Sequence, residues 1–133
     1  MLTSYLCMLM TDHSEKKTLI LGASDNPARY SYLALNRLRE KGYPVLGIGK
    51  KKVKLADVDI DTEKRPYPDV HTVTIYLNPA NQKEYYDYIL SLHPKRVIFN
   101  PGAENPELYE LLKNKGIRPV EACSLVLLST GQF

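Results

Sequence analysis

The first apolar segment of the chain is followed by residues whose types and spacing suit the binding of a phosphate. Lys17 to Leu21 has the length and aliphatic content of a buried strand, and it stops at Gly22. A helical pattern opens near Ser31, and the N–H groups and dipole of a helix N-terminus favour an anion. Gly22 permits close approach of the backbone to a ligand. Ser24 and Ser31 add hydroxyl donors, and Arg29 adds a planar pair of N–H donors.

This loop resembles the Gly-Ala-Ser–Pro–x–Arg–x–Ser pattern of the small single-domain CoA-binding proteins. Their Rossmann-like fold is similar to the CoA-binding domain of succinyl-CoA synthetase α subunits. The resemblance extends, more loosely, from about Lys17 to Phe133, and it implies that the loop binds the phosphates of CoA or an acyl-CoA. The matching residues are Gly22, Ala23, Ser24, Pro27, Arg29 and Ser31.

A run of lysines follows the second predicted strand, Tyr43 to Ile48. Lys50 and Lys51 begin it and place positive charge where the 3′-phosphate of CoA or the 2′-phosphate of NADP could lie. NAD fits less well, because the chain has no G-x-G-x-x-G and no acidic residue at this strand end. A solvated surface run explains the same lysines. The chain also departs here from the resembled family, which usually has Val-Asn-Pro.

Two later loops complete the candidate site by resemblance. Leu77, Asn78 and Pro79 correspond to a loop that flanks the adenosine in the resembled family. Asn100 and Gly102 stand where many relatives carry Gln–x–Gly near the pantetheine or pyrophosphate. Helix capping and turn formation would also explain both groups of residues.

No residue is predicted to be catalytic, and no metal site is predicted. The three histidines, His13, His71 and His93, have neither ligand-like spacing nor a nucleophile nearby in the sequence. Cys123 matches a position that is often Cys in the resembled family, and a helix N-terminus can lower the pKa of a thiol. Free cysteine is nevertheless among the most buried residue types, so we expect a packed, inert thiol.

Strands and helices alternate along the chain in the manner of an α/β protein. This order predicts a Rossmann-like, doubly wound and mostly parallel sheet of five to six strands, with helices on both faces and the ligand at the carboxyl ends of the strands. Residues 55–70 are the least regular part, with a short edge strand around Val58 and Ile60. The other predicted strands lie near 17–21, 43–48, 72–77, 96–99 and 118–122, and the helices near 31–41, 79–90, 105–115 and 124–129.

The composition is that of one compact domain. The chain has 133 residues, of which 44% are hydrophobic, and its formal charge of +3 is too small to indicate a nucleic-acid partner. Cys7 and Cys123 form no disulfide framework, which favours a reducing cytoplasm. Residues 17–133 are predicted to form the domain and residues 1–16 an N-terminal extension. The first ten residues are apolar but too short to span a bilayer, and we expect the natural start at Met8 or Met10.

These observations predict a protein that binds CoA or a short acyl-CoA in a non-catalytic, regulatory or carrier role. One alternative is a small NADP-dependent reductase, although no proton donor stands out. Another is a scaffold for subunit association. The expected partner is a small nucleotide ligand, with no nucleic acid and no membrane, and a homo-oligomer is left open.

Overall fold

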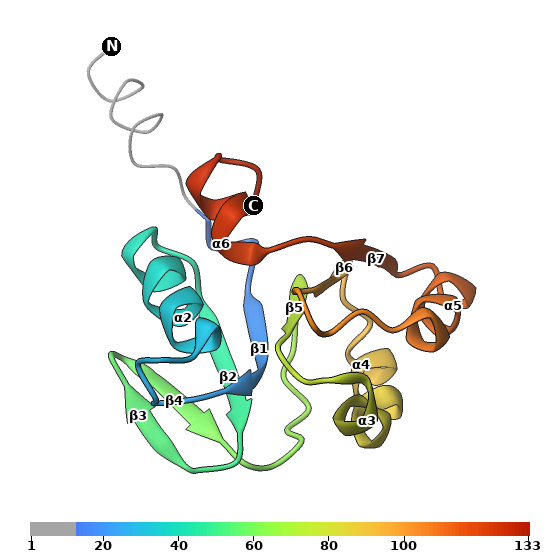
Figure 1. The fold of residues 1–133 in the computed structure, drawn as a ribbon, viewed down its shortest axis with the longest axis horizontal. Helices are drawn as coiled ribbons and strands as arrows, with labels where there is room; N and C mark the ends of the chain where they lie inside the picture. Colours follow the sequence, from blue (N-terminus) through green and yellow to red (C-terminus); the bar gives the residue numbers. More distant parts are fainter. Residues whose placement is uncertain (1–12) are drawn as a thin grey trace.

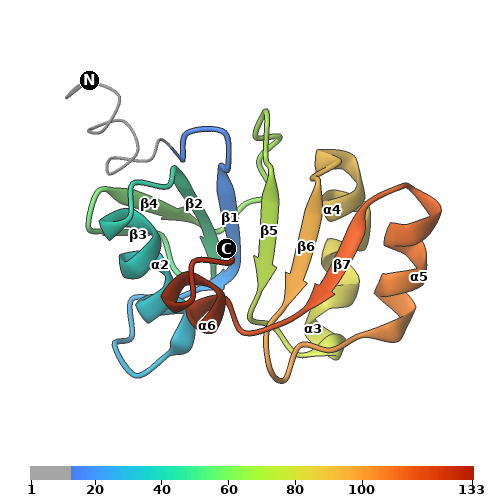
Figure 2. The same ribbon diagram turned by 90° about the horizontal axis from the view of Figure 1, so that it is seen from above.

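The computed structural model describes residues 13–133, which form a seven-stranded sheet with helices on both faces (Figures 1 and 2). The strand order is β3-β4-β2-β1-β5-β6-β7, and every strand is parallel to its neighbours except β3, which pairs antiparallel with β4 at one edge. This confirms the predicted Rossmann-like α/β class. The strands are β1 (Thr18–Ala23), β2 (Val45–Gly49), β3 (Val53–Leu55), β4 (Val58–Asp61), β5 (Thr72–Ile75), β6 (Arg96–Phe99) and β7 (Arg118–Glu121).

Two layers of helices cover the sheet. Helices α2 (Tyr30–Glu40) and α6 (Ser124–Ser129) pack on one face, and α4 (Tyr86–Leu92) and α5 (Pro106–Asn114) pack on the other (Figure 2). Within residues 13–133, no helix has the length and apolar content needed to cross a bilayer. The proposed start at Met8 or Met10 and most of the predicted N-terminal extension lie outside the described residues.

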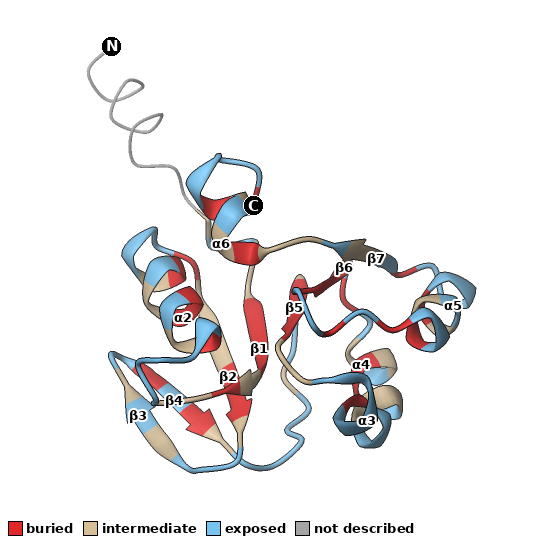
Figure 3. Cartoon of the chain, viewed as in Figure 1, coloured by how far each residue is buried: buried red, intermediate tan, exposed pale blue. Residues whose placement is uncertain are grey.

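The alternation of side chains along the central strand explains the two layers. Leu19 and Leu21 of β1 are fully buried on the side of α4 and α5, whereas Ile20 between them is fully buried on the side of α2 and α6. Both faces of the strand are therefore covered, as expected for a parallel sheet, and its sequence from Leu19 to Ala23 is apolar without a break. Figure 3 shows the same contrast, with buried central strands and helices that are buried along one side.

The sheet has one strand more than the five to six predicted. Strand β3 forms at the end of the lysine run, where no strand was predicted, and it pairs with β4 through Val53 opposite Ile60 and Leu55 opposite Val58. A two-residue turn joins the strands, with Ala56 at a positive φ of 55°, which matches the right-handed twist of a hairpin. The hairpin turn was hard to predict from the sequence because neither of its two residues is a glycine or an asparagine.

The predicted helix at 79–90 is divided into three pieces. α3 (Pro79–Gln82) passes through a 3₁₀ turn, η1 (Lys83–Tyr85), into α4. Asn78 begins α3 as an N-cap, and its side-chain oxygen accepts a hydrogen bond from the Asn81 N–H at 2.9 Å. The division leaves the side chain of Gln82 fully buried beneath the loops at the carboxyl ends of the strands.

The amino ends of the strands are closed by a buried arginine. Arg96, at the start of β6, is 7% exposed and donates to Thr72 Oγ1 at 2.9 Å and to the Phe133 carbonyl oxygen at 2.8 Å. The Phe133 ring lies 4.6 Å from this guanidinium and packs edge-on against Tyr43. Lys16 donates to the same Phe133 oxygen at 3.0 Å. These contacts fix the last residue of the chain against the sheet.

Candidate ligand-binding site

Because β1, β2, β5 and β6 are parallel, the loops that follow them meet at one edge of the sheet. All of the residues predicted for the site lie in these loops, at the strand ends that lead into them, or in the first turn of α2. The structure therefore brings together segments that are far apart in the sequence. They are Gly22, Ala23, Ser24, Pro27, Arg29, Ser31, Lys50, Lys51, Leu77, Asn78, Pro79, Asn100 and Gly102.

Gly22 has a conformation that other residues rarely adopt. Its φ is +93°, and a Cβ atom built on it would lie 3.1 Å from Leu77 Cδ2. The glycine is thus required by the bulge in β1 and by the packing of Leu77. Ala23 is 6% exposed, and its carbonyl oxygen would lie 2.1 Å from a Cβ placed on Gly49 of β2. The close approach of β1 and β2 at this edge therefore also needs glycine in β2, a signal that the sequence contained in Gly47-Ile48-Gly49.

The loop after β1 is ordered by its own side chains. Ser24 Oγ accepts a hydrogen bond from the Asn26 N–H at 3.0 Å, and Asn26 Oδ1 accepts one from the Ala28 N–H at 3.0 Å. The Arg29 N–H then donates to the Asn26 carbonyl oxygen at 3.0 Å. Pro27 is exposed in the middle of this turn. The loop therefore reaches the start of α2 in a defined conformation.

The N-terminus of α2 has no side-chain cap. Arg29 occupies the N-cap position with an extended backbone, and its side chain makes no capping bond. The first turn of α2 contains no acidic residue, so its N–H groups and dipole have no negative partner there. Ser31 is only 3% exposed and lies under the start of the helix. An anion would complement this terminus.

The side chain of Arg29 is exposed. Within residues 13–133, the Arg29 guanidinium makes no hydrogen bond or ion pair. The nearest acidic residue in the loop, Asp25, is bound instead by Lys51, with Nζ 2.9 Å from Oδ2. The hydrogen bond from Lys51 lowers the pKa of the Asp25 carboxyl below its ordinary value. Lys51 thus links the loop after β2 to the loop after β1 and leaves Arg29 free.

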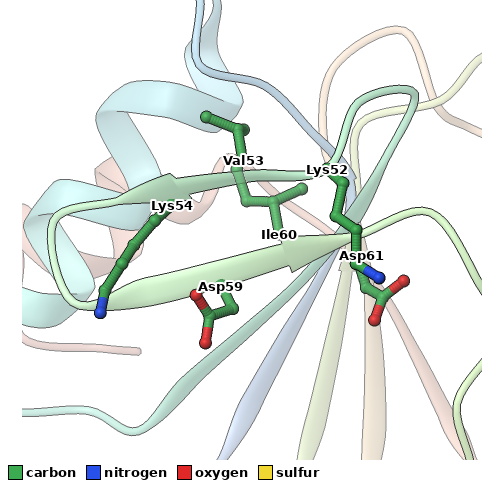
Figure 4. Close-up of a pocket in the computed structure, with 6 residues that line it drawn as sticks. All are labelled: Lys52, Val53, Lys54, Asp59, Ile60 and Asp61. Atoms are coloured by element: carbon green, nitrogen blue, oxygen red, sulfur yellow. The ribbon is translucent and has the colours of Figure 1, made fainter.

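The lysine run continues into an open depression of about 380 Å³ beside the β3–β4 hairpin (Figure 4). Asp61 at its rim accepts a hydrogen bond from Arg65 Nε at 2.6 Å, and this bond holds the pKa of the Asp61 carboxyl at about 2. Lys50 precedes the depression and is exposed. The depression thus combines basic and acidic side chains around two apolar ones. It is lined by Lys52, Val53, Lys54, Asp59, Ile60 and Asp61.

The loops after β5 and β6 are joined by the buried amide of Gln82, which was not among the predicted site residues. Gln82 is fully buried, and its Nε2 donates to the Leu77 carbonyl oxygen at 2.8 Å and to the Ala103 carbonyl oxygen at 2.7 Å. Its Oε1 accepts from Asn105 Nδ2 at 2.9 Å. Leu77 and Pro79 are thereby held against the loop of Asn100 and Gly102. No sequence signal distinguished this glutamine from an ordinary helical residue.

The amide of Asn100 is used entirely within the protein. Nδ2 donates to Thr74 Oγ1 at 2.7 Å and to the Ile75 carbonyl oxygen at 2.9 Å, and Oδ1 accepts from the Ser124 N–H at 2.9 Å. Asn100 therefore holds the start of α6 against the ends of β5 and β6. Gly102, at φ +94°, forms the turn that follows, and its N–H donates to Glu104 Oε1 at 2.8 Å.

A cavity of about 210 Å³, here called the Tyr76 cavity, lies beside these loops. Cys123 lies in its wall as a half-buried free thiol, just before α6, so the predicted packed thiol is packed on one side only. The Tyr76 hydroxyl is buried and has no hydrogen-bond partner among residues 13–133, and the nearby Thr74 and Ser124 hydroxyls lower its pKa by less than burial raises it. Burial raises the pKa of Tyr76 to about 12. The cavity is lined by Tyr30, Tyr76, Asn100, Pro101, Cys123 and Leu125.

None of the described residues forms a group of three or more His, Cys, Asp or Glu side chains arranged to hold a metal ion. The polar features of the carboxyl edge are instead a helix N-terminus, an unpaired arginine and lysines. These groups complement negative charge.

The chain was compared with protein families and with curated proteins. Residues 16–129 match the model of a family described as a CoA binding domain. A search of the curated proteins gave no match.

Solved structures share the whole fold. An uncharacterized protein is 52% identical, with a TM-score of 0.86, and the match covers 89% of this chain and 98% of that one. A protein from Thermus thermophilus is 25% identical, with a TM-score of 0.75 and coverage of 99% and 96%. A hypothetical protein from Pyrococcus horikoshii is 22% identical, with a TM-score of 0.79 and coverage of 96% and 89%, and it supports the fold alone.

Proposed function

Because this chain belongs to the CoA-binding domain family, we propose that it binds CoA or a short acyl-CoA at the carboxyl edge of its sheet. The observation that supports this proposal most directly is the uncapped N-terminus of α2 beside the side chain of Arg29, which has no partner in the described part of the chain. A helix terminus of this kind attracts a phosphate, and a guanidinium can bind two phosphate oxygens in one plane.

The loop after β1 would hold the pyrophosphate. Its conformation is already fixed by the side chains of Ser24 and Asn26, so little order would have to be gained on binding. Arg29 would supply the charge-assisted hydrogen bonds, and the N–H groups of the first turn of α2 would supply the others. Ser24 Oγ accepts a hydrogen bond from the loop and still has its own O–H to donate.

The lysines after β2 would meet the phosphate on the ribose. Lys50 is exposed, and Lys51 is held beside the loop after β1 by its ion pair with Asp25. Leu77, Asn78 and Pro79 would flank the adenosine from the next strand. The Asn78 side chain is committed to capping α3, so its share in binding would come from the loop backbone.

We infer a carrier or regulatory role rather than catalysis. The hydrogen-bonded polar side chains at this edge order the loops, as those of Ser24, Asn26 and Asn100 do, and we identify no acid–base pair among the described residues there. An NADP-dependent reductase and a scaffold for subunit association are the competing functions, and the ligand panel below separates them.

A thermal-shift panel of CoA, acetyl-CoA, NADP, NAD and ADP tests the proposal. A ligand at about 100 times its dissociation constant should raise the free energy of unfolding by roughly 2.7 kcal/mol. Stabilisation by CoA above that by ADP and NADP supports the proposal. A response to NADP alone would favour a reductase, and no response to any nucleotide would favour the scaffold.

A further inference from the structure

The Tyr76 cavity presents an uncharged surface to whatever enters it. None of its six lining residues carries a charge, and the amide of Asn100 is turned inward to Thr74, Ile75 and Ser124. The Tyr76 hydroxyl is likewise enclosed by protein, so its ring forms the wall. A carboxylate in the cavity would lose its water without gaining a cationic partner, which is costly. The lining therefore favours an apolar, uncharged group.

The position of the cavity along the edge suggests which part of a ligand enters it. The lysine run follows β2, the phosphate loop follows β1, and the cavity lies at the ends of β5, β6 and β7, which come next in the sheet. Helix α6, whose Leu125 lines the cavity, packs against α2, the helix that follows the phosphate loop. CoA has the same order of parts: the ribose phosphate, the pyrophosphate, and then the long pantetheine arm that ends in the thiol. Tyr30 connects the two sites, because it follows Arg29 directly and lines the cavity.

We propose that the Tyr76 cavity receives the acyl group of a short, uncharged acyl-CoA. This inference rests on the proposed function, and it names the class of acyl group that this site selects. The volume of about 210 Å³ exceeds that of a buried apolar cavity of about 150 Å³ that binds benzene. A straight or branched chain of roughly four to six carbons is therefore the expected occupant. Dicarboxylic acyl groups such as succinyl are disfavoured by the uncharged wall.

Calorimetry with CoA, acetyl-CoA, butyryl-CoA and succinyl-CoA measures this selectivity on the full chain. Each methylene buried is worth about a fourfold gain in affinity, so butyryl-CoA, with two more methylenes, should bind about fifteenfold more tightly than acetyl-CoA. Succinyl-CoA should bind more weakly than butyryl-CoA, although the two chains have the same number of carbons. Equal affinities for all four ligands would overturn the inference.

Two variants in neighbouring positions of α6 separate the cavity from the helix surface. Leu125→Phe fills the cavity, whereas Val126→Phe changes a side chain that is 56% exposed and outside it. Leu125→Phe should remove the advantage of butyryl-CoA and leave CoA binding nearly unchanged. Val126→Phe should leave both ligands as in the wild type. An equal response of the two variants would place the acyl group elsewhere.

The Cys123 thiol in the cavity wall provides a second measurement, which does not depend on the Leu125→Phe variant. The chain has two cysteines, so Cys7→Ser leaves Cys123 as the only thiol. Saturating butyryl-CoA should slow alkylation of Cys123 by iodoacetamide more than saturating acetyl-CoA does, as measured by intact mass; neither thioester has a free thiol that would consume the reagent. Equal rates with both ligands would overturn the inference, even if Leu125→Phe failed to fold.

The outcomes distinguish this inference from the proposed function. If the wild type binds CoA but shows neither acyl selectivity nor protection of Cys123, the acyl pocket is wrong and CoA binding stands. If no CoA compound binds, the proposed function fails first. A tighter complex with succinyl-CoA than with butyryl-CoA would also contradict the uncharged pocket.

Discussion

Two arginines at opposite ends of the sheet are used in opposite ways. Arg96, at the amino ends of the strands, is buried between Thr72 and Phe133, and its hydrogen-bond partners belong to the protein. Arg29, at the carboxyl ends, is exposed and has no partner among residues 13–133. A buried guanidinium is stable only when it is hydrogen-bonded, whereas an exposed one is solvated and available.

The two edges of the sheet separate the contacts that stabilise the fold from the groups that are available to a ligand. At the amino edge, Arg96 and Lys16 both donate to the Phe133 carbonyl oxygen, which fixes the end of the chain. At the carboxyl edge, the polar side chains order the loops, but the charged groups point outward. The first edge should therefore respond to mutation in stability and the second in ligand affinity.

The largest expected effect is the loss of stability in Arg96→Ala. The substitution leaves the buried Phe133 carbonyl oxygen and Thr72 hydroxyl without this partner and removes the contact with the Phe133 ring. We expect the free energy of unfolding to fall by about 3 kcal/mol, measured by urea denaturation. CoA affinity in the protein that remains folded should not change.

Arg118→Ala is the matched control for that variant. Arg118 pairs with Arg96 in the register of β6 and β7 but is exposed, so its loss should change the free energy of unfolding by less than about 0.5 kcal/mol. If both alanine variants unfold at the same urea concentration as the wild type, the amino edge is not held by the buried arginine.

Arg29→Ala is expected to weaken CoA binding and to leave the stability of the protein unchanged. A charge-assisted contact to pyrophosphate is worth roughly 1.5–3 kcal/mol, so CoA should bind about tenfold to a hundredfold more weakly. Stability without ligand should stay within about 0.5 kcal/mol, since the side chain is exposed. Arg29→Lys should restore affinity only in part, because an ammonium cannot bind two oxygens in one plane.

Arg37→Ala provides the control on the same helix, because Arg37 lies exposed in the last turn of α2, away from the N-terminus. Calorimetry at low salt should show wild-type affinity for this variant. An unchanged dissociation constant for Arg29→Ala would contradict the pyrophosphate site at the start of α2.

Gln82 offers a variant that should affect both properties at once. Gln82→Leu removes two donors and one acceptor that join the loops after β5 and β6. Unpaired buried carbonyls should lower the free energy of unfolding by about 1–2 kcal/mol. The loosened loops should also weaken CoA binding, with a less favourable entropy in calorimetry. A loss of stability with unchanged binding entropy would limit Gln82 to a structural role.

Much of the fold could be predicted because its signals are local and repeated. The apolar run of β1, the Asn-Pro starts of α3 and α5 and the glycines that end α2 and α5 each indicate a boundary from a few adjacent residues. Strand β3 was not predicted because its pairing with β4 depends on a turn through Ala56. Alanine rarely adopts a positive φ, so its residue type did not indicate this turn.

The site was less predictable, because what side chains do there depends on contacts between distant segments. The loops themselves were found from the sequence, since parallel strands bring their carboxyl ends together. The partner of Asp25 is Lys51, 26 residues away, and Asn100 proved to be bonded to Thr74 and Ser124. Neither contact can be predicted from the residues that are adjacent in the chain. The same is true of the buried hydrogen bonds of Gln82.

The smallest expected effect concerns the lysines of the carboxyl edge. Lys50 and Lys51 are exposed, and the Lys51–Asp25 ion pair lies at the surface, so each contributes little. If they meet the ribose 3′-phosphate, the double variant Lys50→Ala/Lys51→Ala should bind CoA up to about fivefold more weakly, while dephospho-CoA should lose much less. Salt screens exposed charges, so the difference should shrink from low to high ionic strength. It should also shrink below about pH 6, because the phosphate then takes up its second proton and loses charge. Equal losses for both ligands at every salt concentration would identify the run as a solvated surface, and Arg29 would remain the principal phosphate ligand.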